Sequence, residues 1–217
     1  MATEPTGRCW RCDHQHQIVL FCPACEAIQL LSSQVDYFTL LGFPRQPAVD
    51  ERELANRYYE LSRRLHPDLF QTGTIQEKEA SLQNTALLNR AYRTLRDAVQ
   101  RGQYWLELHG ERLGKDNNRV PPKLAALVFD IQEKLDEIRE SRRKGNVTAG
   151  QAELAEMSND LEGQLSQLRD ALDRNLARWG EVHDQKDCAV LLVALKNTLS
   201  EIAYLRTLLR DVEKESE

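Results

Sequence analysis

The sequence has few aromatic residues and no long apolar run. Aromatic side chains make up 6% of its 217 residues, whereas charged side chains make up 29%. This balance is typical of helical hairpins and bundles rather than of an enzyme built around a deep pocket. The apolar runs are only a few residues long, far short of the roughly 20 residues that cross a membrane. We therefore expect no membrane segment.

Several kinds of chemistry also lack their sequence signals. There is no glycine-rich loop to cradle a phosphate and no nucleophile paired with a base, so we expect no enzymatic activity. The formal net charge of −5 gives no general attraction to nucleic acid. Residues 1–8 lack the apolar core of a signal peptide. We therefore expect a cytoplasmic protein, or a protein of the mitochondrial matrix if the source is eukaryotic and the chain is processed.

Four of the five cysteines form two CxxC pairs near the N-terminus. The pairs are Cys9 with Cys12 and Cys22 with Cys25. Each pair can turn both thiolates toward one point, so two pairs can close a tetrahedral site. A reducing cytosol favours metal ligation over disulfides. We expect a structural zinc ion here, with a rubredoxin-like iron as the alternative, because four thiolates suit either ion.

The remaining thiol and imidazole groups near this motif have simpler interpretations. His14 and His16 lie between the two pairs and are expected on the surface of the connecting loop rather than as ligands. Cys188 is interpreted as a small residue on a helix.

Two stretches around residue 66 carry apolar residues at helical spacing. The stripe of the first stretch, from Asp50 to Leu65, is Leu54, Tyr58, Leu61 and Leu65. The stripe of the second, from about Gln76 to Val99, is Leu88, Tyr92, Leu95 and Val99, with Ala91 beside it. Asp50 is a plausible N-cap. The two stripes can face each other in an antiparallel hairpin.

The connection between these stretches contains the tripeptide His66, Pro67 and Asp68. Proline disfavours the α conformation in the residue before it, so the first helix is expected to end at His66. His66 and Asp68 are then held at an exposed tip. Preceded by the segment DYFTLLG at 36–42, this arrangement resembles a J-domain, the module that makes a partner chaperone hydrolyse ATP.

Further segments narrow the resemblance. LHPDLF at 65–70, NRAYRTL at 89–95 and RGQYWLELHG at 101–110 are similar to segments of the HscB co-chaperones of iron-sulfur cluster assembly. Ordinary J-proteins do not share the last of these. No Gly/Phe-rich spacer follows the J-domain, which argues against a general carrier of unfolded proteins.

The resemblance implies a surface that contacts an HscA/DnaK-type chaperone. Its expected residues are the loop and three arginines of the preceding helix: His66, Pro67, Asp68, Arg57, Arg63 and Arg64. Arg57 and Arg64 are seven positions apart and share one helical face, which suits an acidic groove on the partner. We also expect Asp68 to pair with this basic face.

Three amphipathic helices are predicted from Pro121 onward. The first stripe is Leu124, Leu127, Ile131, Leu135 and Ile138; the second is Leu154, Met157, Leu161, Leu165, Leu168, Leu172 and Leu176; the third is Leu192, Leu195, Leu199, Ile202, Leu205 and Leu209. Three antiparallel helices in a bundle would cover these stripes. A free-standing coiled coil is the alternative, although the heptads are short and interrupted.

In the HscB family such a bundle binds the iron-sulfur scaffold protein IscU. Alignment with that family implies these scaffold contacts: Ala125, Ala126, Phe129, Asp130, Glu133, Glu137 and Tyr204. Alanines at 125 and 126 stand where the family has bulkier apolar residues. Phe129 is not needed for the core stripe of its helix, so it is expected to be exposed.

Together these patterns predict an all-α protein with a zinc-ribbon-like knuckle, a J-domain hairpin and a three-helix bundle. The expected domains are a four-cysteine head at 1–35, a J-domain at 36–112, a linker at 113–120 and the bundle at 121–217. The favoured function is a non-enzymatic co-chaperone bridging the chaperone and IscU. A J-domain adaptor for another client and a thiol redox or metal-sensing J-protein are alternatives. Whether the head packs on the J-domain or forms a homodimer stays open.

Overall fold

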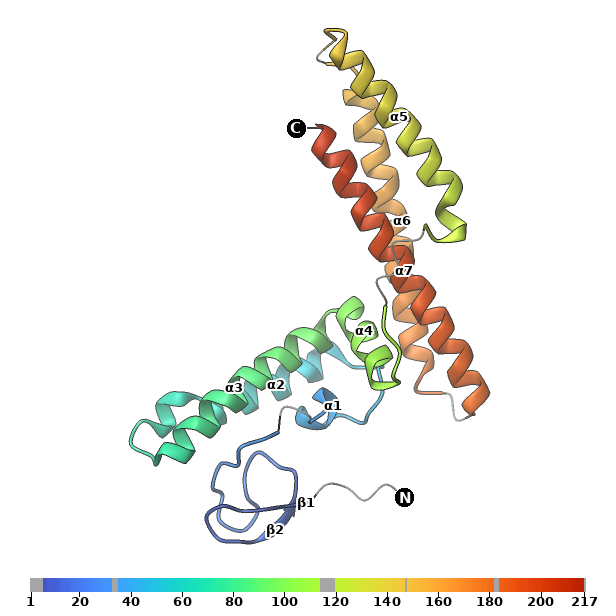
Figure 1. Cartoon of the computed structure of the whole chain (residues 1–217). Helices are drawn as coiled ribbons and strands as arrows, with labels where there is room; N and C mark the ends of the chain where they lie inside the picture. Colours follow the sequence, from blue (N-terminus) through green and yellow to red (C-terminus); the bar gives the residue numbers. More distant parts are fainter. Residues whose placement is uncertain (1–5, 33–34, 114–119, 147, 182–183, 217) are drawn as a thin grey trace. The chain divides into compact units, whose positions relative to one another are not determined.

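The computed structural model describes residues 6–32, 35–113, 120–146, 148–181 and 184–216 (Figure 1). Its contacts group the chain into two compact units, Met1–Gln100 and Arg101–Glu217. Among these described residues, all regular structure is helical except one pair of short strands and an isolated bridge. The predicted all-α fold with a small N-terminal knuckle is confirmed.

The first unit joins a short β-hairpin to a helical hairpin. Its elements in chain order are β1 (Thr6–Arg8), β2 (Gln15–Gln17), α1 (Tyr37–Leu40), α2 (Glu51–Leu65), the 3-10 helix η1 (Pro67–Phe70) and α3 (Ile75–Arg96). β1 and β2 pair antiparallel. Helices α2 and α3 run side by side (Figure 1).

The predicted stripes meet in the α2–α3 hairpin. Leu54, Leu65, Leu88 and Leu95 are fully buried. At the edge of this core the Tyr58 ring stacks on the Tyr92 ring with centroids 4.1 Å apart, and the Tyr58 hydroxyl donates to Asn89 Oδ1 at 2.8 Å. Stacked aromatic rings contribute about 0.5–1.5 kcal/mol beyond the burial of their area, so this contact stabilises the packing of α2 on α3.

Local signals set the ends of these helices. The Asp50 carboxylate accepts the Glu53 amide at 2.8 Å and caps α2, as predicted. Thr74 and Glu77 form a capping box that begins α3. The second helix was expected to continue to Val99, but α3 ends at Arg96. Asp97 is extended there, and its carboxylate accepts an amide of the next helix.

The second unit is a bundle of long helices. They are α4 (Ala98–Leu108, of which residues from Arg101 onward belong to this unit), the 3-10 helix η3 (Pro122–Leu124), α5 (Ala125–Arg143), α6 (Gln151–Arg178) and α7 (Gln185–Ser216). The last three pack side by side, as Figure 1 shows. The predicted three-helix bundle is present.

The buried stripe of α7 differs from the prediction at both ends. Leu191 and Leu208 are buried, whereas the predicted Leu192 and Leu209 are only half-buried. Adjacent leucines at each of these positions look equivalent in the sequence. The packing of α7 against α6 selects the leucine one residue earlier in each case.

Residues of α4 pack on the bundle. Gly102 lies against leucines of α6 and α7, and the Trp105 ring meets the Trp179 ring edge-on at 5.2 Å between centroids. The contacts therefore divide the chain at Arg101, whereas we expected the J-domain to end at 112. Most of the expected linker, residues 114–119, lies outside the described residues.

Within the described part of the chain, one helix has the length and composition to cross a membrane. It covers Lys186–Ser216 within α7. Uninterrupted apolar runs, the only signal used for a membrane segment in the sequence, did not identify this helix. Its apolar stripe, including Leu195, Leu199 and Ile202, is fully buried in the bundle. A core helix of a bundle passes the same test, so this finding is weak evidence for a membrane segment.

Candidate functional site

The two CxxC segments fold into equivalent turns. The Asp13 amide donates to the Cys9 carbonyl, and the Glu26 amide donates to the Cys22 carbonyl, both at 2.9 Å. Asp13 and Glu26 each have a φ near +57°, in the left-handed region. The pairs that close the base of each turn are also equivalent: Arg8 opposite Gln15, and Phe21 opposite Ile28. The chain thus builds one knuckle twice.

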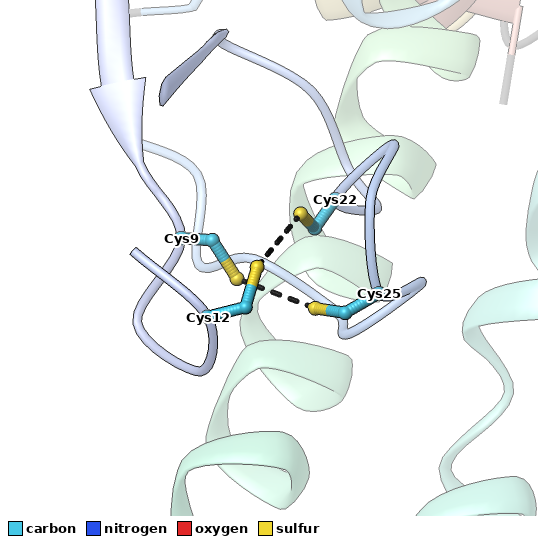
Figure 2. Close-up of side chains that lie close together, drawn as sticks. All are labelled: Cys9, Cys12, Cys22 and Cys25. Carbon is cyan, nitrogen blue, oxygen red and sulfur yellow. Dashed lines mark hydrogen bonds between the residues drawn. The ribbon is translucent and has the colours of Figure 1, made fainter. Parts of the chain in front are cut away.

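The four sulfur atoms converge on one point between the knuckles (Figure 2). The Sγ atoms of Cys9 and Cys25 are 3.6 Å apart, and those of Cys12 and Cys22 are 3.7 Å apart. All four sulfur atoms lie within 4.8 Å of one another. A tetrahedral ion with metal–sulfur bonds of about 2.3 Å needs sulfur atoms roughly 3.8 Å apart. The four cysteines are therefore positioned to hold a metal ion.

Without a cation, the thiols differ in acidity. Burial opposes ionisation of Cys9, but the backbone amides of Cys12 and Arg11 outweigh it and lower the pKa of Cys9 to about 6. At Cys12 the backbone donor at His14 is outweighed by the Cys25 thiol and by burial, which raise its pKa to about 12. The pKa of Cys25 is also raised, because the backbone donor at Ala27 is outweighed by burial together with the Cys9 and Cys22 thiols. A bound cation would stabilise all four thiolates and so remove this difference in acidity among the cysteines.

The donor set fits an ion with no open position. Four thiolates would complete a tetrahedral shell, so the ion would be structural rather than catalytic. His14 and His16 are not members of the four-sulfur cluster. Cys9 and Cys22 are buried, whereas Cys12 is exposed.

The predicted chaperone loop lies at the end of the α2–α3 hairpin. His66, Pro67 and Asp68 are all exposed. His66 has an extended ψ of 128° and ends α2, as expected from the proline that follows it. Its Nδ1 atom accepts the Asp68 amide at 3.3 Å. The loop is therefore ordered by local bonds and presents its side chains outward.

The expected pairing of Asp68 with the basic face of α2 is not found. Among the described residues, the Asp68 carboxylate contacts Gln71 at 3.2 Å and His66 at 3.5 Å, and no ion pair joins it to an arginine. Pro67 begins η1 and turns Asp68 toward these neighbours.

Arg57 makes its contacts inside the unit. Its guanidinium donates to the carbonyl oxygens of Leu41 and Gly42, pairs with Glu53, and lies 4.2 Å from the ring centroid of Phe43. It thereby ties α2 to the loop that follows α1. A partner contact of Arg57 stays a prediction.

The other two predicted arginines of α2, Arg63 and Arg64, are more exposed. Arg64 stacks 4.2 Å above the Phe21 ring of the cysteine head. Arg63 is exposed and donates from Nε to the Tyr59 carbonyl. Two of the three predicted arginines therefore cover aromatic rings of their own unit.

The predicted scaffold contacts of α5 share an exposed surface. All six are exposed: Ala125, Ala126, Phe129, Asp130, Glu133 and Glu137. Phe129 is 68% exposed, which is high for an aromatic side chain on a helix with its own buried stripe. It borders a shallow hollow with Gln132, Glu133, Asp136, Glu137 and Glu140. Tyr204, on α7, is half-buried.

Three buried polar residues with structural roles were not predicted. Gln29, Ser81 and Asn84 are each less than a tenth exposed. Gln29 and Asn84 bond to the cysteine head, and Ser81 bonds to the end of α2. Asn84 continues the stripe of Leu88 and Leu95 one turn earlier, so a polar residue at a core position was the available signal.

Comparisons with known proteins agree with this geometry. The model of the DnaJ domain matches residues 36–104. The iron-sulfur cluster co-chaperone protein HscB of Homo sapiens is 35% identical over 135 residues, which are 60% of this chain and 57% of the human protein. The HscB homolog of Arabidopsis thaliana is 24% identical over 82% of this chain and 62% of the plant protein. The chain thus spans about three fifths of the length of these relatives.

Solved structures cover more of the chain. The crystal structure of human co-chaperone protein HscB aligns with a TM-score of 0.71 and 26% identity, over 96% of this chain and 98% of that chain. The chaperone HscB from Vibrio cholerae aligns with a TM-score of 0.57 and 23% identity, over 83% of this chain and 96% of that one, which shows a shared fold. The J-domain match, the shared fold and the four-cysteine cluster together make the chain similar to the HscB co-chaperones.

Proposed function

We propose that this protein is a non-enzymatic co-chaperone of iron-sulfur cluster assembly. Its J-domain would stimulate ATP hydrolysis by an HscA/DnaK-type chaperone, and its bundle would deliver an IscU-type scaffold. The observation that carries the proposal is the exposed loop of His66, Pro67 and Asp68 at the end of a packed hairpin. The human and plant relatives carry names that specify the same process.

The chaperone contact is proposed for the loop and for α2. The loop is held in one conformation, so little ordering is needed when it binds. Arg63 and Arg64 would face an acidic groove and speed association. Arg57 would act by holding the Gly42 loop against α2, with or without a direct partner contact.

The scaffold contact is proposed for the exposed surface of α5. Phe129 would supply the apolar anchor, and Asp130, Glu133 and Glu137 would surround it with negative charge. A scaffold with a basic rim around an apolar pocket suits this surface. Ala125 and Ala126 add little apolar area, while Tyr204 would contribute from α7.

For the head we propose a structural zinc ion held by Cys9, Cys12, Cys22 and Cys25. Iron is the alternative, and elemental analysis of the purified protein separates the two. Free thiols grouped in this way suit a reducing compartment. We propose the bacterial cytosol, or the mitochondrial matrix in a eukaryote.

The test is steady-state ATP hydrolysis by the chaperone with wild-type protein or with His66→Gln, each with and without IscU. We expect stimulation that requires His66 and rises further with IscU. Glu79→Gln, an exposed change on α3, serves as the matched control and should keep full stimulation. Stimulation that is unchanged in His66→Gln would overturn the J-domain assignment.

The scaffold step is tested separately by IscU binding to Phe129→Ala. Val193→Ala is the matched control, because Val193 is an exposed apolar residue of the same unit on a different helix. We expect binding to weaken at least about tenfold in Phe129→Ala, as for an interface anchor, and to be unchanged in the control. Stimulation that needs His66 but ignores IscU would point to another client.

A further inference from the structure

Among the described residues, the side chain of Asn84, on α3, hydrogen-bonds to the backbone of the cysteine head. It is 1% exposed. Its Nδ2 atom donates to the Gln29 carbonyl at 2.7 Å, and its Oδ1 atom accepts the Leu31 amide at 3.1 Å. A buried amide with both ends bonded to one segment holds that segment in a defined position. The head is therefore docked on the J-domain helix through this residue.

Gln29 connects this docking point to the sulfur cluster. Its side chain is buried, and Nε2 donates to the Ala27 carbonyl at 2.7 Å and to Cys9 Sγ at 3.4 Å. Its Oε1 atom accepts the Trp10 amide at 3.4 Å. The residue whose carbonyl binds Asn84 thus also donates a hydrogen bond to a predicted metal ligand, and such outer-shell donors orient the ligands of metal sites.

The same turn of α3 holds the base of the chaperone loop. The Leu65 carbonyl accepts the Ser81 hydroxyl at 2.6 Å and the Thr85 hydroxyl at 3.2 Å. Leu65 is the last residue of α2 and directly precedes His66. Residues 81–85 therefore contact the head through Asn84 and the loop through the two hydroxyls.

We infer that Asn84 is a positioning residue that couples metal binding in the head to the order of α3 and of the His66–Asp68 loop. Four thiols that converge on one point lose their common partner when the ion leaves, so the knuckles are then held only by their backbone hydrogen bonds. The Gln29 carbonyl and the Leu31 amide would then be held less firmly against Asn84, and the turn at 81–85 would loosen. Coupling of this kind is reciprocal, so weakening the docking point must also weaken metal binding.

The decisive experiment measures the Zn²⁺ affinity of the full-length protein by competition with a chromophoric chelator. We compare Asn84→Ala with Ser81→Ala, which changes a buried residue of the same turn that contacts α2 instead of the head. We expect the affinity of Asn84→Ala to fall about tenfold or more, because Gln29 then loses the anchor that positions its outer-shell hydrogen bond to Cys9. The affinity of Ser81→Ala should stay within about twofold. Equal affinities in the two variants would overturn the inference.

A second measurement needs no variant and covers the case in which Asn84→Ala fails to fold. Amide hydrogen exchange of the wild-type protein is followed before and after Zn²⁺ is removed with a chelator. We expect faster exchange at residues 81–88 of α3 and at the Leu69 amide, which bonds to the His66 carbonyl. Helices α5, α6 and α7 are the internal control and should not change.

Unchanged exchange in α3 after Zn²⁺ removal would contradict the coupling. Neither measurement contains a chaperone or a scaffold, so failure of the coupling is distinguishable from failure of the proposed function. If the coupling holds, metal loss would reduce the order of the loop without any change in its own sequence.

Discussion

Pro67 restricts the backbone conformation of the residue before it. It disfavours the α conformation at His66, which is extended with a ψ of 128°. The helix therefore ends at Leu65, and the Leu65 carbonyl needs donors from outside α2. A buried carbonyl left without a partner costs about 1–3 kcal/mol. The hydroxyls of Ser81 and Thr85 remove this cost, so the loop depends on α3 as much as on its own residues.

At the same scale, Cys9 predicts a pH-dependent proton count. We expect Zn²⁺ binding to the metal-free protein to release close to one more proton per ion at pH 5 than at pH 7, measured by pH-stat titration. The backbone donors lower the pKa of Cys9 to about 6 despite its burial. This thiol is therefore largely ionised at pH 7 and protonated at pH 5, where the ion must displace its proton.

The variant Cys9→Ser serves as the control. It should lose this pH dependence of proton release while keeping the other three thiols. If wild-type protein released the same number of protons at both values of pH, the metal-free head would not keep the hydrogen bonds around Cys9.

Among the elements, α3 has the widest set of contacts in the first unit. Leu88 and Leu95 pack in the hairpin core, Asn84 binds the head, and Ser81 holds the end of α2. Its length of 22 residues makes this possible, because one long helix can present different segments to different neighbours.

Two glycines of the bundle, one before α6 and one inside it, are expected to respond oppositely to substitution by alanine. Gly150 has a φ of 78°, and an added Cβ would lie 2.6 Å from Cδ1 of the buried Ile138. Gly150→Ala should therefore lower the free energy of unfolding by more than about 1 kcal/mol. Gly163 lies inside α6, where an added Cβ meets no atom within 4 Å. Gly163→Ala should raise that free energy by about 0.5–1 kcal/mol.

Urea unfolding followed by circular dichroism measures both effects. The two variants make the same chemical change in the same unit, so opposite signs isolate the backbone conformation and the contact with Ile138 as the cause. A loss of stability in both would contradict the account of Gly163.

For the whole molecule, the main finding is that the chain divides at Arg101, inside α4. The expected J-domain included the segment from Arg101 to Gly110 and ended at residue 112. Its residues Gly102 and Trp105 pack against α6 and α7. The matched DnaJ domain continues to residue 104, so the family match and the packing assign the residues 101–104 differently.

This division predicts that Trp105→Ala affects one unit and spares the other. Trp105 is 5% exposed, and its loss should lower the free energy of unfolding of residues 101–217 by about 3–5 kcal/mol. Hydrogen exchange in α6 and α7 under increasing urea reports this change. The Zn²⁺ affinity of the head should be unaffected, and Trp105→Phe should retain most of the stability.

The sequence by itself determined the local features of this protein. Helical spacing predicted the α2–α3 hairpin and the stripes of the bundle, and the position of Pro67 predicted the end of α2. The two CxxC pairs predicted the four-sulfur cluster. These features were readable because each depends on residues within a few turns or within one short loop, where spacing alone sets the geometry.

Only the tertiary structure decided which side chains serve the fold. Arg57 and Arg64 read as a free basic face, but they stack on Phe43 and Phe21. Gln29 and Asn84 are 55 positions apart, and no local sequence pattern in either segment predicts their contact. Side chains with equal periodicity and charge are separated only by what packs against them, and the bonds between distant segments exist only once the helices have packed.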